Sequence, residues 1–227
     1  MSILMKQYLA ETSYINFSDS EIQKAALAHS SPECTDKENA ISLYYFVRDQ
    51  IRYDPYAFSM DKDCYVATYA LASGSGFCIS KAVLYAAVLR AIKIPSRLGF
   101  ADVKNHLTSE RLLKLMGTDI FYYHGYTEVY LDGRWLKATP AFNKELCEKA
   151  GTLPLEFDGE SDSIFHSFSQ DGSKHMEYIK DHGAFDDVPY DVISSAHAGV
   201  YGTSFSDNFQ ASKNDSSFES EVVNVGK

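Results

Sequence analysis

The stretch SGSGFCISKAVLYAAVLRAIKIPSR, residues 73–97, decides the fold. Two glycines and an aromatic residue lead through Cys78 directly into a run of strong helix formers, and Pro95 ends that run. Cys78 is therefore predicted at the start of a helix, where free backbone N–H groups and the positive end of the helix dipole favour a thiolate. The apolar residues recur at helical spacing, so we expect the rest of this helix to lie in the core. The alternative for Cys78 is a small buried core residue, the usual place of a free cysteine.

A second stretch, FYYHGYTEVYLDGRWLKATP over residues 121–140, predicts a β-hairpin. Aromatic and β-branched residues alternate on both sides of Asp132-Gly133, a dipeptide that favours tight turns. His124 then lies on the first strand of the hairpin. A cysteine at a helix start followed by a histidine on a strand is the order of papain-like nucleophilic sites, in which the imidazole takes the thiol proton. Cys78 and His124 are therefore the predicted nucleophile and general base.

Together with SLYYFVRDQIRYD (residues 42–54), these stretches resemble the core of the transglutaminase-like superfamily. The resemblance runs from about residue 41 to residue 142. It rests on a Gly-x-Cys helix start, an Ile-Pro-x-Arg strand start, and a His-x-aromatic-x-Glu strand followed by a turn and Trp135. It implies an α+β, papain-like core in which the cysteine helix packs on a small, mainly antiparallel sheet. It also implies a cysteine enzyme of small bacterial type, with Cys78 and His124 in the catalytic roles.

The third member of the expected catalytic triad departs from the family pattern. The family places an aspartate just before a proline after its tryptophan, and here Thr139 precedes Pro140. A threonine hydroxyl can orient a histidine ring through a hydrogen bond, but it brings no charge to stabilise the imidazolium. The competing hypothesis is a carboxylate from a neighbouring strand, and Asp102 is the first candidate because its strand should pair with that of His124. Thr139 and Asp102 are both candidate catalytic residues.

The resemblance implies acyl transfer. Cys78 attacks an amide or ester carbonyl, and His124 accepts the thiol proton and later donates one to the leaving group. We expect a peptide or protein amide substrate and hydrolysis by water. The alternatives are a protein-crosslinking transglutaminase, in which an amine takes the acyl group, and a binding or assembly protein that keeps the fold with a degraded site.

Composition and charge narrow the range of partners. The chain has 227 residues, 45% of them hydrophobic, and a formal net charge of −10. Without a basic patch, neither nucleic acid nor an anionic membrane surface is an expected partner. Apolar runs stay shorter than the roughly 20 residues of a membrane span, and the N-terminus does not read as a secretion signal.

Cysteine and acidic patterns bear on cofactors and compartment. The four cysteines lack Cys-x-x-Cys spacing, which argues against a zinc ribbon or a thioredoxin-like centre. A chain this long and this apolar also needs no disulfide scaffold, so a reducing cytoplasm is the expected compartment. There is no Asp-x-Asp-x-Asp loop of the calcium-binding kind. A metal site at Asp102 and His106 would be short of ligands. We therefore expect neither a metal nor a cofactor.

Three segments are expected along the chain. Residues 1–142 form the catalytic core with its N-terminal helices, residues 143–201 an acidic C-terminal extension packed on the core, and residues 202–227 a polar, mobile tail. Within the core, residues 1–20 are expected to be extended. The remaining predicted elements are helices over residues 21–29, 39–52 and 108–116, and a strand over residues 97–103.

Overall fold

The computed structural model describes residues 3–106, 108–165, 172, 175–202, 209 and 218–222. The helices are η1 (Ile3–Leu9), α1 (Ser20–Ala28), α2 (Asp36–Gln50), η2 (Pro55–Ala57), η3 (Lys62–Tyr65), α3 (Ala67–Ser73), α4 (Cys78–Ala91), α5 (Glu110–Met116), α6 (Lys144–Ala150), α7 (Tyr190–Tyr201) and α9 (Phe218–Val222). The strands are β1 (Arg52–Tyr53), β2 (Ser75–Gly76), β3 (Ser96–Asn105), β4 (Ile120–Leu131), β5 (Arg134–Ala138) and β6 (Met176–Phe185).

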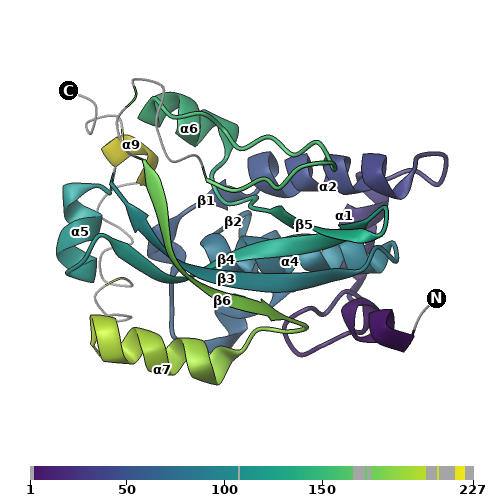
Figure 1. Ribbon diagram of the computed structural model, residues 1–227, viewed down its shortest axis with the longest axis horizontal. Helices are drawn as coiled ribbons and strands as arrows, with labels where there is room; N and C mark the ends of the chain where they lie inside the picture. The colour runs from purple at the N-terminus through teal and green to yellow at the C-terminus, as the bar shows by residue number, and fades with distance from the viewer. Residues whose placement is uncertain are drawn as a thin grey trace.

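The fold is α+β and is built around an antiparallel sheet in the order β5-β4-β3-β6. Helix α4 packs against β3 and β4, and its residues from Ile79 to Arg90 are all buried. A helix buried on every side needs a largely apolar surface all round, which explains why small and aliphatic residues make up most of its sequence; the buried Lys81 and Arg90 donate hydrogen bonds to backbone carbonyls. In Figure 1 the sheet crosses the middle of the molecule, with α2 and α6 drawn above it and α7 below it.

The predicted β-hairpin is confirmed. Strands β4 and β5 pair on either side of Asp132 and Gly133, whose φ angles of 50° and 85° are both positive. Two successive positive φ angles are the requirement of a tight type I′ turn, which asparagine, aspartate and glycine meet most easily.

The helix predictions hold with shifted ends. Helix α2 begins at Asp36, earlier than expected, because Thr35 and Glu38 form a capping box that starts it there. The prediction that residues 1–20 are extended is wrong for η1. This short 3-10 helix lies close to the sheet, and Tyr8 packs edge-on against Trp135 with 4.9 Å between the ring centroids.

The region after residue 142 holds more regular structure than its pattern indicated. It supplies α6, β6 and α7, and β6 pairs antiparallel with β3, so this strand completes the same sheet that carries the predicted core. Most of the predicted mobile tail, residues 202–227, lies outside the described residues. Among the helices that the structure describes, none is both long and apolar enough to cross a membrane.

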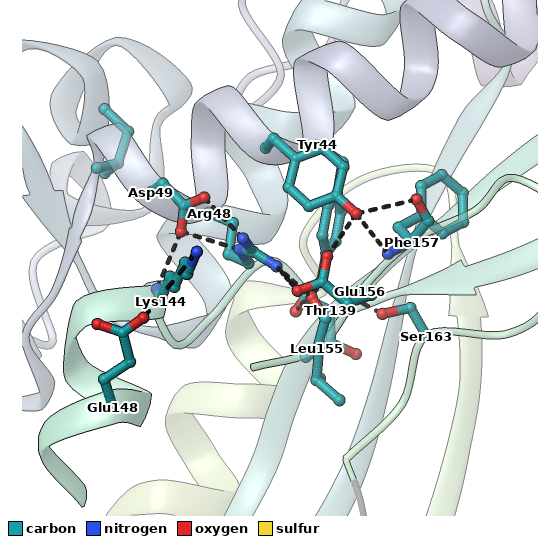
Figure 2. Close-up of polar contacts among 12 residues, drawn as sticks. Tyr44, Arg48, Asp49, Thr139, Lys144, Glu148, Leu155, Glu156, Phe157 and Ser163 are labelled. Carbon is teal, nitrogen blue, oxygen red and sulfur yellow. Dashed lines mark hydrogen bonds and ion pairs between the residues drawn. The ribbon is translucent and has the colours of Figure 1, made fainter. Parts of the chain in front are cut away.

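A polar network joins α2 to the chain that follows β5 (Figure 2). The Tyr44 hydroxyl lies 3.1 Å and 3.0 Å from the carbonyl oxygens of Thr139 and Leu155. The buried guanidinium of Arg48 donates to the same Leu155 carbonyl at 2.7 Å and pairs with Asp49. These contacts give buried backbone carbonyls their hydrogen-bond partners and fix the segment in which Thr139 lies.

Candidate active site

Cys78 is the first residue of α4, as predicted. The preceding Phe77 is the N-cap residue, and its side chain makes no capping hydrogen bond, so the first-turn N–H groups of α4 stay open toward the sulfur. The backbone N–H groups of Cys78, Ile79 and Gly125 all lower the pKa of the thiol. Burial acts more strongly in the opposite direction and raises that pKa to about 11. The expectation that the helix start makes Cys78 a thiolate is therefore wrong for this state, because the surroundings of the sulfur are dry although the residue keeps some exposed surface.

His124 lies on β4, as predicted, and only 3% of it is exposed. Burial lowers the pKa of the imidazole to about 3. Neither ring nitrogen has a hydrogen-bond partner within the part of the chain that the structure describes. The ring instead packs edge-on against Phe165, with 5.0 Å between the centroids. His124 is thus a neutral imidazole at neutral pH.

Cys78 and His124 line one cavity of about 50 Å³. The start of α4 meets β4 beside them, since a Cβ on Gly125 would stand only 2.9 Å from the Cα atom of Ile79. Glycine is therefore required at this crossing. Most of the remaining wall is apolar or aromatic and includes Tyr53, Phe58, Phe77, Phe121, Tyr123 and Phe209. Because pockets for small-molecule ligands measure roughly 300–1,000 Å³, the cavity as it stands has no room for a substrate.

Thr139 does not hydrogen-bond to His124. It follows β5, is 1% exposed, and its hydroxyl interacts with the hydroxyl of Tyr178 on β6. The last residue of β5, Ala138, pairs with Thr127, so continued pairing would place Thr139 diagonally from His124. Diagonal neighbours in a sheet lie about 7–8 Å apart, which a short hydroxyl side chain does not span.

Asp102 does not hydrogen-bond to His124 either. On β3, Ala101 is the residue opposite His124, and Asp102 follows it. Successive side chains of a strand point to opposite faces of the sheet, which turns Asp102 away. Its Oδ1 atom accepts hydrogen bonds from His182 Nε2 at 2.7 Å and from the backbone N–H of Tyr123 at 3.1 Å. The structure thus places Cys78 and His124 on the wall of one cavity without a hydrogen bond between them, and neither proposed third group is hydrogen-bonded to His124.

Sequence reasoning missed two residues beside the site. His197 and Tyr201 of α7 line the same cavity as Cys78, and His197 Nε2 donates to the carbonyl oxygen of Tyr122 at 2.9 Å. Burial lowers the pKa of His197. The two residues are four apart and therefore share a helix face, but only a predicted helix at residues 190–201 could have revealed that pattern.

His106 is placed away from the cavity wall, where its Nε2 atom lies 3.4 Å from Glu177. Among the described residues, no group of three or more histidine, cysteine, aspartate or glutamate side chains is arranged to hold a metal ion.

Comparisons with known proteins agree with this arrangement. The family model of the transglutaminase-like superfamily matches residues 24–140, a range that includes both Cys78 and His124. A solved structure of a candidate cysteine protease from Cytophaga hutchinsonii is similar, with a TM-score of 0.54 and 16% sequence identity. The match covers 85% of this chain and 50% of that one, so this chain spans about half the length of that protein. At this identity the likeness shows the fold alone.

No curated protein matches the sequence. The family model, however, covers more than half of the 227 residues. It includes both the buried helix that starts at Cys78 and the hairpin that carries His124. The chain therefore belongs to the transglutaminase-like superfamily.

Proposed function

We propose that this protein is a cysteine-dependent hydrolase of amide or peptide bonds that works through an acyl-enzyme on Cys78. Its family supports a cysteine-dependent enzyme in general terms. The observation that carries the specific proposal is that Cys78, at an uncapped helix start, and His124, on the facing strand, line one cavity. Among the described residues neither His124 ring nitrogen has a hydrogen-bond partner, so the imidazole is free to exchange a proton.

The proposed reaction has two steps. The Cys78 sulfur attacks the substrate carbonyl carbon while His124 takes the thiol proton, and the carbonyl oxygen becomes an oxyanion near the open N–H groups of α4. His124 then protonates the leaving amine as the C–N bond breaks, which leaves a thioester. In the second step His124 takes a proton from water, the resulting hydroxide attacks the thioester, and the thiol and a carboxylic acid are released.

The pKa values of Cys78 and His124 support the interpretation of the cavity as a resting state. Proton transfer from a thiol whose pKa is raised to an imidazole whose pKa is lowered is unfavourable while both groups stay buried. Because burial causes both shifts, admitting substrate or water to the cavity moves the two pKa values toward each other. Catalysis in this account therefore begins with opening of the cavity.

The same observation favours a second candidate function, a binding or assembly protein with a degraded site. Burial keeps the Cys78 thiol and the His124 imidazole neutral, and no third group is hydrogen-bonded to His124 among the described residues. A protein that has lost catalysis but kept the fold would show the same arrangement. The hydrogen bonds of Asp102 favour a positioning role over that of a third catalytic group, whereas the role of Thr139 as that group stays a proposal. So does a cytoplasmic location, which the four free cysteines support.

Turnover of a mixed peptide amide library separates these functions. We expect release of new carboxyl termini by the wild type, and a loss of at least about 10³-fold in Cys78→Ala and His124→Ala, as for removal of a nucleophile or its base. The matched control is Cys147→Ala, since Cys147 is also buried but belongs to α6. Added glycine methyl ester distinguishes the acceptor, because a transglutaminase would form the amide with it. Peptide binding without turnover in wild type and Cys78→Ala alike would favour the binding protein.

A further inference from the structure

Strand β4 carries a β-bulge immediately before His124. Where β3 contributes the single residue Asp102, β4 contributes Tyr122 and Tyr123, and the pairing register shifts by one. Tyr123 has a φ angle of 55°, in the left-handed region that residues other than glycine, asparagine and aspartate rarely adopt. A bulge re-aims the side chains beside it, and bulges are common next to active sites. Here the next side chain is the proposed base.

Side chains from outside β4 satisfy the backbone groups of this bulge. Asp102 Oδ1 accepts the N–H of Tyr123 at 3.1 Å. The Tyr201 hydroxyl accepts the N–H of Tyr122 at 2.9 Å, and His197 Nε2 donates to the carbonyl oxygen of the same residue at 2.9 Å. Buried backbone N–H and C=O groups need partners, so these three contacts make the bulge stable.

Strand β6 holds Asp102 in place on the other side of β3. His182 Nε2 donates to Asp102 Oδ1 at 2.7 Å, and both side chains are about one-tenth exposed, at 10% and 9%. The His182 ring also stacks on Tyr123, with 3.9 Å between the centroids and 15° between the planes. The register of β6 against β3 shifts between Phe100 and Ala101, where His182 is the extra residue. The register shifts of β4 and β6, the two neighbours of β3, therefore both lie beside Asp102.

We infer that Asp102, His197 and Tyr201 are positioning residues for the reaction proposed above, on which this inference rests. They fix the bulge, and the bulge sets the direction from which His124 faces Cys78. The His124 ring has no hydrogen-bond partner of its own among the residues described, so its orientation depends on its backbone and its packing. Asp102 acts through the N–H of Tyr123 and not as the carboxylate of a triad.

Two substitutions of Asp102 separate these roles. Asp102→Asn keeps an oxygen that accepts the Tyr123 N–H but removes the charge, whereas Asp102→Ala removes the acceptor. A displacement of about 1 Å at a reacting group can cost about 100-fold. We expect kcat to fall about 100-fold in Asp102→Ala with KM little changed, and to stay within about tenfold of wild type in Asp102→Asn. The matched control is His106→Gln, which removes the other histidine–carboxylate pair between the same two segments of chain.

His197 provides an independent pair of variants, which decides the matter if Asp102→Ala does not fold. The glutamine amide in His197→Gln can still donate to the Tyr122 carbonyl, whereas His197→Ala cannot. A positioning role predicts a lower kcat in His197→Ala and recovery in His197→Gln. A rise in KM at constant kcat in both variants would instead identify a substrate contact and overturn the assignment of His197.

The geometry can also be measured without turnover, through the ¹³C–¹⁵N NMR signals of the His124 ring, assigned with His124→Phe. We expect wild-type signals in Asp102→Asn and shifted or broadened signals in Asp102→Ala. If the wild type proves inactive but these signals behave as expected, the proposed function fails, while Asp102 is still shown to fix the orientation of the His124 ring. Asp102→Asn as damaged in kcat as Asp102→Ala, or wild-type signals and rates in Asp102→Ala, would overturn the inference.

Discussion

The buried imidazole of His124 makes stability depend on pH in a way that one substitution should remove. The fold lowers the pKa of His124 from 6.5 to about 3 because burial disfavours the charged form. In the unfolded chain the same ring takes up a proton below about pH 6.5. Between these two pKa values the unfolded state binds more protons than the folded state, so the free energy of unfolding falls as the pH falls.

The magnitude follows from the two pKa values. Each pKa unit corresponds to about 1.4 kcal/mol, so the full shift from 6.5 to about 3 amounts to about 5 kcal/mol, lost completely below about pH 3. Between pH 7.5 and pH 5 the loss due to His124 alone is about 2 kcal/mol. His124→Phe removes the titrating group and replaces a ring without hydrogen bonds among the described residues by an apolar one.

Urea unfolding of wild type and His124→Phe at pH 7.5 and pH 5 measures this difference. We expect the wild type to lose about 2 kcal/mol more than the variant over this interval. His197, whose pKa is also lowered, is present in both proteins, so its effect cancels in the comparison. Parallel losses in wild type and His124→Phe would show that His124 is not buried and neutral, and would refute the reasoning.

Three further predictions concern packing around the site. Gly125→Ala should lower the free energy of unfolding by about 1–3 kcal/mol in urea unfolding, because its Cβ would meet the α4 backbone at 2.9 Å; an unchanged value would mean that helix and strand can separate easily. Lys81→Met should destabilise by about 2–3 kcal/mol in the same assay, since the buried side-chain nitrogen of Lys81 donates to two backbone carbonyls at the end of α2. An unchanged free energy of unfolding would show that these carbonyls find other partners. Phe209→Ala should speed iodoacetamide labelling of Cys78 several-fold by opening the cavity wall, while the labelling rate of the exposed Cys34 stays constant. An unchanged labelling rate of Cys78 would exclude Phe209 as a barrier to the reagent.

The parts of the fold that were predicted correctly are those whose sequence patterns are local. The apolar run of α4, the Asp132-Gly133 turn and the alternation of β4 are each complete within about twenty residues, so the sequence predicts them directly. Strand β6 gives no such signal. Most of its residues are exposed or half-buried, and it is a strand because it pairs with β3, about 80 residues earlier in the chain.

The candidate site also combines features with a local sequence signal and features that depend on distant parts of the chain. The motifs identified Cys78 and His124, but the pKa of Cys78 depends on how deeply the rest of the chain buries it, and that balance reversed the expected direction. Asp102 was a reasonable candidate for the carboxylate beside His124. Its actual hydrogen-bond partner, His182, comes from β6, so no reasoning that left out that strand could have found it.

The central claim, an acyl-enzyme on Cys78, is tested most directly by intact-protein mass spectrometry after brief exposure to p-nitrophenyl acetate, followed by peptide mapping. The account predicts one added acetyl group, carried by Cys78, formed in wild type, lost again on standing in buffer, and absent in Cys78→Ala. His124→Ala should acetylate far more slowly than wild type. Acetylation of another residue, or an equal rate of acetylation with and without His124, would contradict the account.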